Sequence, residues 1–311
     1  MLTSFSNLQS RTRIKIHSLS VIWVFFGIVY LLSLHQIIEM KRIGLLGCGA
    51  IGTQIAIAID TGMIPAQLTH IFDSDRSKAE TLVTKLKQKP EIVENAHLLS
   101  SNSLDLVVEA ASQDAVSDNA LSILQNRKDL MIMSGGALLD ESVYEIISDA
   151  CKEFKKTVYL PSGAISGLDA LKSVRNELES VTITTTKHPN SLRGAKFFET
   201  SDIELDKISE KTTIFEGSAS EAVRLFPKNV NVSALLSLAG IGSHETIVKV
   251  VVDPNTDKNI HHIEFKGNFG KITTTVENVP DATNPKTSRL AVLSAIETLR
   301  SICTDEIKIG T

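Results

Sequence analysis

The sequence is poor in cysteine and carries no excess of positive charge, and each absence excludes a class of protein. Its 311 residues include only Cys48, Cys151 and Cys303, which form no C-x-x-C pair and no metal-like cluster with the histidines. Cysteines this sparse suit a reducing cytosol and argue against a disulfide framework. The formal net charge of −4 leaves no basic footprint for nucleic acid. We therefore expect no nucleic-acid partner and no metal site.

The stretch from Ile43 to Asp73 predicts a dinucleotide-binding unit. Ile43 to Leu46 is a short apolar run, which is typical of a strand buried on both faces. Residues 47–52 then spell G-x-G-x-x-G, and a helical pattern follows to about Thr61. A second strand ends at Asp73, about twenty residues past the last glycine, where a carboxylate can accept hydrogen bonds from an adenosine ribose.

Each glycine of this motif has its own task. Gly47 allows a tight turn, Gly49 removes the Cβ that would keep a pyrophosphate from the backbone, and Gly52 lets the helix sit close to the strand. The helix N-terminus offers free N–H groups to the phosphates. The expected cofactor is NAD or NADP, because Asp73 disfavours a 2′-phosphate while Arg76 is close enough to accommodate one. The residues expected to bind the cofactor here are Gly47, Gly49, Ala50, Ile51, Gly52 and Asp73.

Strands and helices alternate through residues 40–163, which predicts a dinucleotide-binding domain built on a doubly wound parallel sheet. Further expected strands cover 106–112, 130–137 and 157–161, and expected helices cover 76–87, 115–124 and 140–154. Small residues end the strand at Ser112, and Ala111 among them is expected at the carboxyl edge where cofactors bind. Residues 162–170 either leave the backbone open to a nicotinamide ring or simply cap a helix.

From Ser180 the pattern changes, and it predicts a smaller α+β domain over residues 164–283, for substrate binding and dimerisation. Expected strands cover 181–187 and 212–216, expected helices cover 218–225 and about 226–239, and an antiparallel sheet is expected over 246–253, 259–266 and 271–276. A last helix covers 289–302, within a C-terminal segment of residues 284–311.

His261 and His262 are adjacent in one expected strand, so only one of them can face a cleft. Their spacing does not say which. The sequence likewise leaves the roles of Lys187 and Lys286 undecided, because each is either a solvated charge or the partner of a carboxylate.

Residues 19–34 form an apolar run that follows several basic residues, with no Ala-x-Ala cleavage site after it. Taken literally, this is a signal anchor a little under the ~20 residues needed to span a membrane. Such an anchor would place the dinucleotide site outside the cell, where its cofactor is not available. Met40 stands three residues before the first expected strand. We therefore expect Met40 to be the true start and residues 1–39 to be an over-extended gene model, with a membrane anchor as the alternative.

Seven blocks follow one another in an order that is specific when they are taken together: Gly47-x-Gly49-x-x-Gly52, Glu109–Ser112, Ser162–Ala170, Phe215–Ala219, Phe226–Val232, Asn259–His261 and Asn284–Ser288. Together they resemble the L-aspartate dehydrogenase family. The resemblance runs from Met40 to the C-terminus and leaves residues 1–39 without a counterpart. Ser166 stands where the family usually has a second glycine.

The resemblance implies a Rossmann domain followed by an α+β domain, with residues 284–311 returning to the first domain. The family oxidises L-aspartate to iminoaspartate with NAD(P)+, which feeds quinolinate and hence NAD biosynthesis, and the imine hydrolyses to oxaloacetate and ammonia. The resemblance also implies a cytoplasmic homodimer. By the same resemblance His261, rather than His262, is the active-site histidine, and Ala164 and Asn231 match cofactor-contacting positions.

The chemistry of that reaction suits these residue types. Hydride leaves Cα only if the amine is neutral, so a histidine base is useful. The two carboxylates of aspartate need partners in the pocket, and we expect Lys187 and Lys286 for that task, with Thr287 and Ser288 as neutral donors. The alternatives are another Rossmann oxidoreductase, such as a homoserine or dihydrodipicolinate-type reductase, and a non-catalytic NAD-binding sensor.

Overall fold

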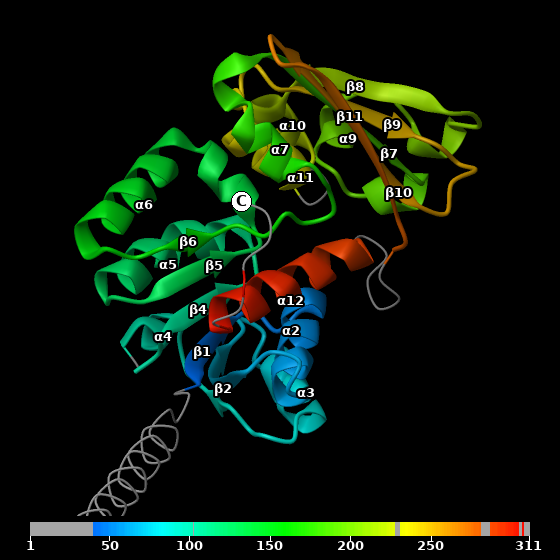
Figure 1. Cartoon of the computed structure of the whole chain (residues 1–311). Helices are drawn as coiled ribbons and strands as arrows, with labels where there is room; N and C mark the ends of the chain where they lie inside the picture. Colours follow the sequence, from blue (N-terminus) through cyan, green and yellow to red (C-terminus); the bar gives the residue numbers. More distant parts are fainter. Residues whose placement is uncertain (1–39, 102, 228–230, 281–286, 305–306, 308–311) are drawn as a thin grey trace, which may run out of the picture. The chain divides into compact units, whose positions relative to one another are not determined.

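Two β-sheets organise the residues described by the computed structural model, which are 40–101, 103–227, 231–280, 287–304 and 307 (Figure 1). The first sheet has the strand order β3-β2-β1-β4-β5-β6, and all its pairs are parallel. Its strands are β1 (Lys41–Leu46), β2 (Ala66–Phe72), β3 (Glu91–Ile92), β4 (Leu106–Glu109), β5 (Asp129–Ile132) and β6 (Val158–Tyr159). The doubly wound parallel sheet expected from the sequence is confirmed. The expectations for residues 1–39 and Lys286 lie outside the described residues.

Helices cover both faces of the first sheet because side chains of its central strand alternate between two apolar clusters. Ile43 and Leu45 of β1 lie in one cluster with α2 (Ala50–Asp60) and α3 (Arg76–Lys85). Leu46 lies in the other cluster, which includes residues of α4 (His97–Ser101), α5 (Gln113–Gln125) and α6 (Glu141–Phe154).

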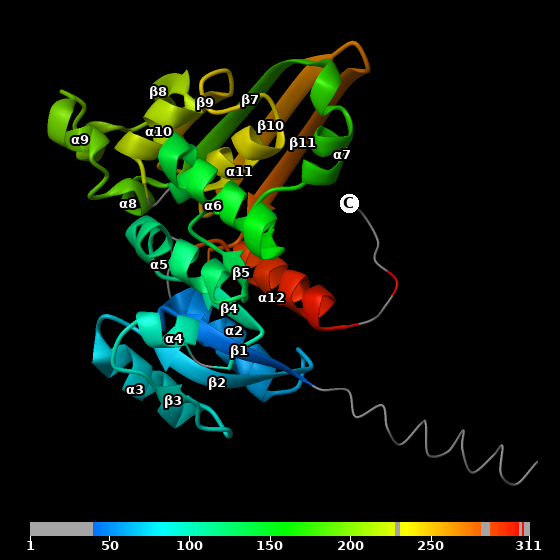
Figure 2. The ribbon, with the colours of Figure 1, turned by 90° about the vertical axis from the view of Figure 1, so that its left-hand side faces the viewer.

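The last helix, α12 (Arg289–Cys303), lies beside α2, as Figures 1 and 2 both show. Its buried Ala295 and Leu299 belong to the same apolar cluster as Ile43 and Leu45. The expectation that the C-terminal helix returns to the first sheet is therefore confirmed.

The second sheet has the order β11-β10-β7-β9-β8. Its strands are β7 (Leu178–Lys187), β8 (Thr212–Ser218), β9 (Ile247–Val252), β10 (Asn259–Gly267) and β11 (Gly270–Asn278). Helices α7 (Leu168–Ser173), α10 (Ala219–Leu225) and α11 (Asn231–Ala239) contribute to one core with its inner face. Shorter elements are α8 (Pro189–Leu192), α9 (Phe197–Thr200), and the 3₁₀ turns η1 (Gly135–Leu139), η2 (Arg175–Glu177) and η3 (Leu205–Lys207).

The expected antiparallel group of β9, β10 and β11 is wrong in one respect. β10 and β11 form an antiparallel hairpin, but β9 does not pair with β10, because β7 lies between them. β7 runs antiparallel to β10 and parallel to β9. The loop after β9 therefore passes the end of β7, where the Asp253 amide donates to the Lys187 carbonyl at 3.0 Å. Alternation in a sequence identifies strands, but it does not say which strand lies beside which.

The inner face of the second sheet changes from apolar to polar along β7 and β10. Val181 and Ile183 of β7 are followed, two residues at a time on the same face, by Thr185 and Lys187. In β10 the matching series is Phe265, Ile263, His261 and Asn259, and all eight side chains are buried. The polar ends of both strands therefore lie together under cover of the fold.

Within the described residues, no helix has both the length and the apolar character that are needed to span a membrane.

Candidate active site

The three glycines of the G-x-G-x-x-G turn have different surroundings. Gly47 has φ +101, and a Cβ there would lie 2.6 Å from the Ala110 carbonyl oxygen. A Cβ on Gly52 would lie 2.0 Å from the Gly47 carbonyl oxygen, so the first turn of α2 closes directly on the loop. A Cβ on Gly49 would meet nothing within 4 Å. Two glycines thus allow the fold, and the third leaves open space in front of the α2 N-terminus, where a phosphate can approach.

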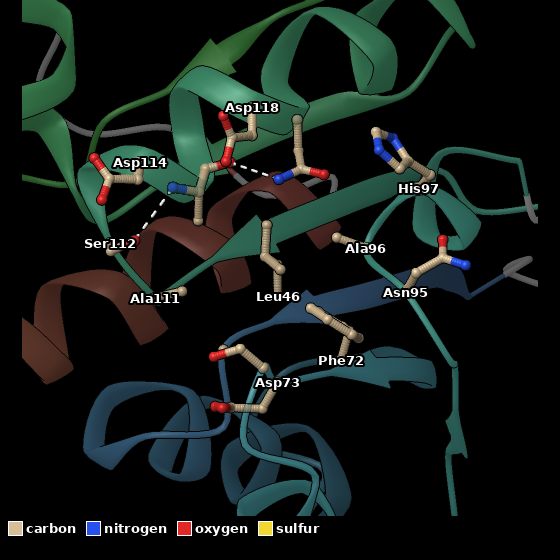
Figure 3. A pocket seen from close by; sticks show the side chains of 14 residues that line it. Leu46, Phe72, Asp73, Asn95, Ala96, His97, Ala111, Ser112, Asp114 and Asp118 are labelled. Atoms are coloured by element: carbon tan, nitrogen blue, oxygen red, sulfur yellow. Dashed lines mark hydrogen bonds between the residues drawn. The ribbon is translucent and has the colours of Figure 1, made fainter.

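A cavity of about 420 Å³, the first cavity, opens beside this turn (Figure 3). Gly47, Asp73 and Ala111 of the predicted cofactor residues line it. Gly49, Ala50 and Gly52 do not; they form the turn and the start of α2. The sequence motifs missed six polar residues of its wall, and only the rule that ligands bind at the carboxyl edge of a parallel sheet points to them. These residues are Ser74, Asn95, His97, Asp114, Asp118 and Asn119.

Asp73 is held in place by two backbone amides. One carboxylate oxygen accepts from Cys48 N at 2.7 Å, and the other accepts from Asp75 N at 2.9 Å. Burial, and then the charge of Asp73, raise the pKa of the Cys48 thiol to about 12, so this cysteine stays neutral. Arg76 pairs with Glu80 at 3.1 Å and does not line the cavity. A negative charge therefore faces the ligand space here.

Glu109, at the end of β4, ties the loops after β4 and β5 together. Its Oε1 accepts from Ala111 N at 2.7 Å and from Ser134 Oγ at 2.9 Å. Its Oε2 accepts from Ser134 N at 3.0 Å and from Met133 N at 3.2 Å. The side chain is 1% exposed, and burial raises its pKa although the hydrogen bonds oppose this. The sequence signal was an acid at the end of an apolar strand, and its role was missed.

A second cavity, of about 110 Å³, brings the remaining predicted residues together from distant parts of the chain. Ile51 comes from the start of α2, and Ala164 follows the parallel sheet. Lys187 and His261 come from the polar ends of β7 and β10, and Asn231 begins α11. Thr287 and Ser288, just before α12, complete the predicted set. Among the described residues, the predicted substrate groups thus share one cavity with three of the predicted cofactor contacts.

His261 is 2% exposed and faces Thr185, its direct register partner on β7. Its Nδ1 lies 3.0 Å from the Thr185 hydroxyl oxygen. Burial, and then the charge of Lys187, lower the pKa of His261 to about 3. The neighbouring His262 is exposed on the other face, with its Nδ1 2.8 Å from Thr275 Oγ1. Of the two histidines, only His261 lines the cavity.

Lys187 is 4% exposed, and burial lowers its pKa to about 8. No acidic side chain lines the second cavity among the described residues, and none forms an ion pair with Lys187. An ammonium in this position is costly unless an anion joins it. The cavity therefore suits a ligand that brings its own carboxylate.

The side-chain oxygen of Asn231 is buried without a hydrogen-bond partner in the described structure. A Cβ on Gly136 would lie 3.2 Å from this oxygen, so the glycine leaves space beside the Asn231 amide. A buried acceptor without a donor is rare in folded proteins. The amide group or a ribose hydroxyl of a nicotinamide nucleotide could donate to it, and the open space at Gly49 fits the pyrophosphate. No group of three or more potential metal ligands occurs among the described residues.

The chain matches the sequence models of two protein families. "Homoserine dehydrogenase, NAD binding domain" matches residues 47–161, which include the glycine turn and Asp73. "Aspartate dehydrogenase, C-terminal" matches residues 169–302, which include Lys187, Asn231 and His261. Together the two matches include the residues that line the two cavities, except Leu46, Gly163 and Ala164.

Individual relatives agree with these family matches. The chain is 68% identical over 272 residues to an L-aspartate dehydrogenase of Nitrosopumilus maritimus, and 49% identical over 273 residues to one of Methanocella arvoryzae. Each alignment covers 88% of this chain and 100% of the relative. The crystal structure of aspartate dehydrogenase from Thermotoga maritima aligns with a TM-score of 0.69 at 29% identity, over 87% of this chain and 100% of that one.

Proposed function

The chain belongs to the L-aspartate dehydrogenase family, and from this premise we propose that it oxidises L-aspartate to iminoaspartate with NAD(P)+. The observation that carries the proposal is the ammonium of Lys187. It is buried beside His261, in a cavity whose described lining contains no acid. A dicarboxylate amino acid brings a second carboxylate that can pair with Lys187, whereas an amino acid with a neutral side chain brings only an α-carboxylate, whose charge its own ammonium balances.

The cofactor would lie along the carboxyl edge of the parallel sheet. Asp73 and Ala111 would hold its adenosine end, the amides at Gly49 and Ala50 its pyrophosphate, and Ile51, Ala164 and Asn231 its nicotinamide end. Bound NAD(P)+ supplies the hydride acceptor. The partnerless Asn231 oxygen supports this placement.

His261 acts as the base in this proposal. Its lowered pKa keeps the imidazole neutral at pH 7, so it can take a proton from the substrate ammonium before hydride leaves Cα. A carboxylate paired with Lys187 removes the repulsion that opposes protonation of His261, so substrate binding makes the histidine a stronger base. Once the imidazolium has released that proton to solvent, the same imidazole can activate water for hydrolysis of the imine to oxaloacetate and ammonia.

Lys187 and Ser288 would bind the substrate carboxylates, together with Thr287 and Lys286. Asn259 Nδ2 lies 3.5 Å from Ser288 Oγ. The hydroxyl of Ser288 can therefore donate to a ligand while it accepts from Asn259.

We further propose that the protein is a homodimer in the cytoplasm. Its product would feed quinolinate synthesis and hence NAD biosynthesis. A nicotinamide cofactor is available in the cytoplasm, which supports this location. The outer face of the second sheet carries exposed and half-buried polar side chains, including His262 and Glu264, and can form a subunit interface. Light scattering on the purified protein and fractionation of cells test these two statements.

Initial rates of NAD+ and NADP+ reduction test the central proposal. We expect L-aspartate to give a kcat/KM at least about a hundredfold above those for L-glutamate and L-homoserine, because a poorly paired carboxylate or an unpaired Lys187 is costly. Faster oxidation of L-homoserine would favour the homoserine-type alternative. Normal cofactor binding without turnover of any amino acid would favour a sensor.

A further inference from the structure

Thr185 is the polar neighbour that touches the ring of His261 within the described structure. The two residues face each other in register across β7 and β10, and they are 1% and 2% exposed. The distance from Thr185 Oγ1 to His261 Nδ1 is 3.0 Å. Because this contact occupies Nδ1, Nε2 is the ring nitrogen left for the cavity that His261 lines.

We propose that Thr185 is a positioning residue for His261: its hydroxyl accepts from Nδ1–H, so that Nε2 stays unprotonated and directed into the cavity as the proton acceptor. This inference rests on the proposed role of His261 as the base. It adds a residue that touches neither substrate nor cofactor and that acts through the histidine alone.

A hydroxyl suits this position better than the groups that usually orient a histidine. A carboxylate beside Nδ1 would stabilise the imidazolium and keep the base protonated near neutral pH. The threonine hydroxyl is neutral, and it can accept from Nδ1–H both before and after Nε2 gains a proton. When Nε2 takes the proton from the substrate ammonium, the Nδ1–H bond to Thr185 remains and helps to stabilise the positive ring.

The surroundings of His261 contain few competing charges. On the β11 side its register partner is Val276, and from the other lining elements Ile51, Asn231 and Ser288 face the cavity without a charge. Lys187 is the titratable group that shares the cavity among the described residues. The protonation of His261 is therefore governed by burial, by Lys187 and by Thr185.

The test compares T185V, T185S and T186V in the full-length protein. Valine keeps the shape of threonine without the hydroxyl, and serine keeps the hydroxyl. Thr186 is the matched control, because it is also buried, at 4% exposed, but points to the opposite face of β7. We expect T185V to lower kcat by about tenfold or more, with the Kd of NAD+ unchanged. T185S should keep most of the activity, and T186V should keep all of it.

The pH profile separates this role from simple packing. Without the hydroxyl the imidazolium loses a hydrogen bond, so the acid limb of the kcat profile should move to lower pH in T185V and return in T185S. Equal losses in T185V and T186V, or an unshifted limb, would overturn the inference. If H261A keeps normal turnover, the proposed function itself fails; if H261A is inactive while T185V is fully active, only the role of Thr185 fails.

A measurement on the unaltered protein covers the case in which T185V does not fold. Nitrogen-15 NMR of labelled histidine at pH 7 reports which ring nitrogen carries the proton. We expect the Nδ1–H tautomer for His261, and the Nε2–H tautomer would overturn the inference.

Discussion

The ammonium of Lys187 and the imidazole of His261 line one buried cavity, and the charge of the lysine is the second cause, after burial, of the low pKa of the histidine. The two groups cannot both carry a proton cheaply without an anion between them. An anionic ligand therefore changes the protonation of both residues when it binds. If His261 is the base, as we propose, substrate binding and base strength are therefore coupled in this site.

Replacing His261 by alanine removes the proposed base. We expect turnover to fall by about a hundredfold or more, the usual effect of losing an acid–base group. Cofactor affinity should change little, because the first cavity and the glycine turn do not include this residue. Steady-state kinetics and NAD+ titration check both statements. H262A is the control: His262 is exposed on the opposite face, and its loss should leave kcat unchanged.

Replacing Lys187 by methionine should separate stability from binding. Burial lowers the Lys187 pKa from 10.5 to about 8, which corresponds to a cost on the order of 3 kcal/mol for keeping the ammonium charged. We expect K187M to raise the free energy of unfolding at pH 7 by up to that amount and to raise KM for L-aspartate by about a hundredfold.

Urea unfolding and initial rates measure both effects. K249M is the matched control, because Lys249 is partly exposed on the adjacent strand and pairs with Glu216 at 2.9 Å. It should change stability by less than about 1 kcal/mol and leave KM unchanged. A destabilised K187M with normal KM would contradict the assignment.

Acid should destabilise the fold through His261. The folded-state pKa is about 3 and the ordinary value is 6.5, so between these values the unfolded chain binds a proton that the folded chain does not. The stability contributed by the neutral ring is complete above about pH 6.5 and is lost as pH falls, by up to about 1.4 kcal/mol per pH unit. Urea unfolding between about pH 4 and pH 7 gives the free energy of unfolding at each pH. This free energy should change less with pH in H261N than in the unaltered protein.

Much of the first half of the fold can be predicted because its determinants are local. The glycine turn, its flanking strands and Asp73 lie within about thirty residues. Gly47 and Gly52 are required by close backbone contacts, and Gly49 leaves the space for a phosphate. The site in the second half depends on register. Nothing in the spacing of His261 and His262 says which face of β10 is covered, and that follows only from pairing with β7. Only the family resemblance distinguished them beforehand.

Thr185 is a functional candidate that the alternating pattern of its strand did not single out. The series Val181, Ile183, Thr185 and Lys187 continues one buried face to the end of β7. A polar residue at an inward position near a strand end marks a site. The partner of that residue, however, lies 76 positions away on β10, and the misassigned neighbour of β9 shows that such pairings are not local information.

Replacing Asp73 by serine should relax cofactor selection. The carboxylate lines the first cavity, while Arg76 is paired with Glu80 outside it. We therefore expect the native protein to prefer NAD+, and D73S to raise the NADP+ to NAD+ ratio of kcat/KM by about tenfold or more, equivalent to about 1.4 kcal/mol. D75S is the control, since Asp75 is an exposed N-cap of α3 that serine can replace. A native preference for NADP+ would contradict this reading.

Replacing Glu109 by glutamine tests the charge state of a buried acid. Three of its four hydrogen-bond donors are backbone amides, from Ala111, Met133 and Ser134, and an amide can only donate. Both carboxylate oxygens therefore accept, which favours the ionised form, while burial raises the pKa. A glutamine would turn an NH2 group toward at least one of these amides. We expect E109Q to lose about 2–3 kcal/mol of stability.

The same substitution should raise the Kd of NAD+, because Ala111 lines the first cavity and its amide is held by Glu109. D140N is the control: Asp140 is an N-cap of α6 that accepts from Ser142 N and Val143 N, and asparagine retains an acceptor there. Thermal unfolding and cofactor titration measure both variants. If E109Q is as stable as D140N and binds NAD+ normally, Glu109 is protonated in the fold, and the carboxyl does not act as an anion that orders the two loops.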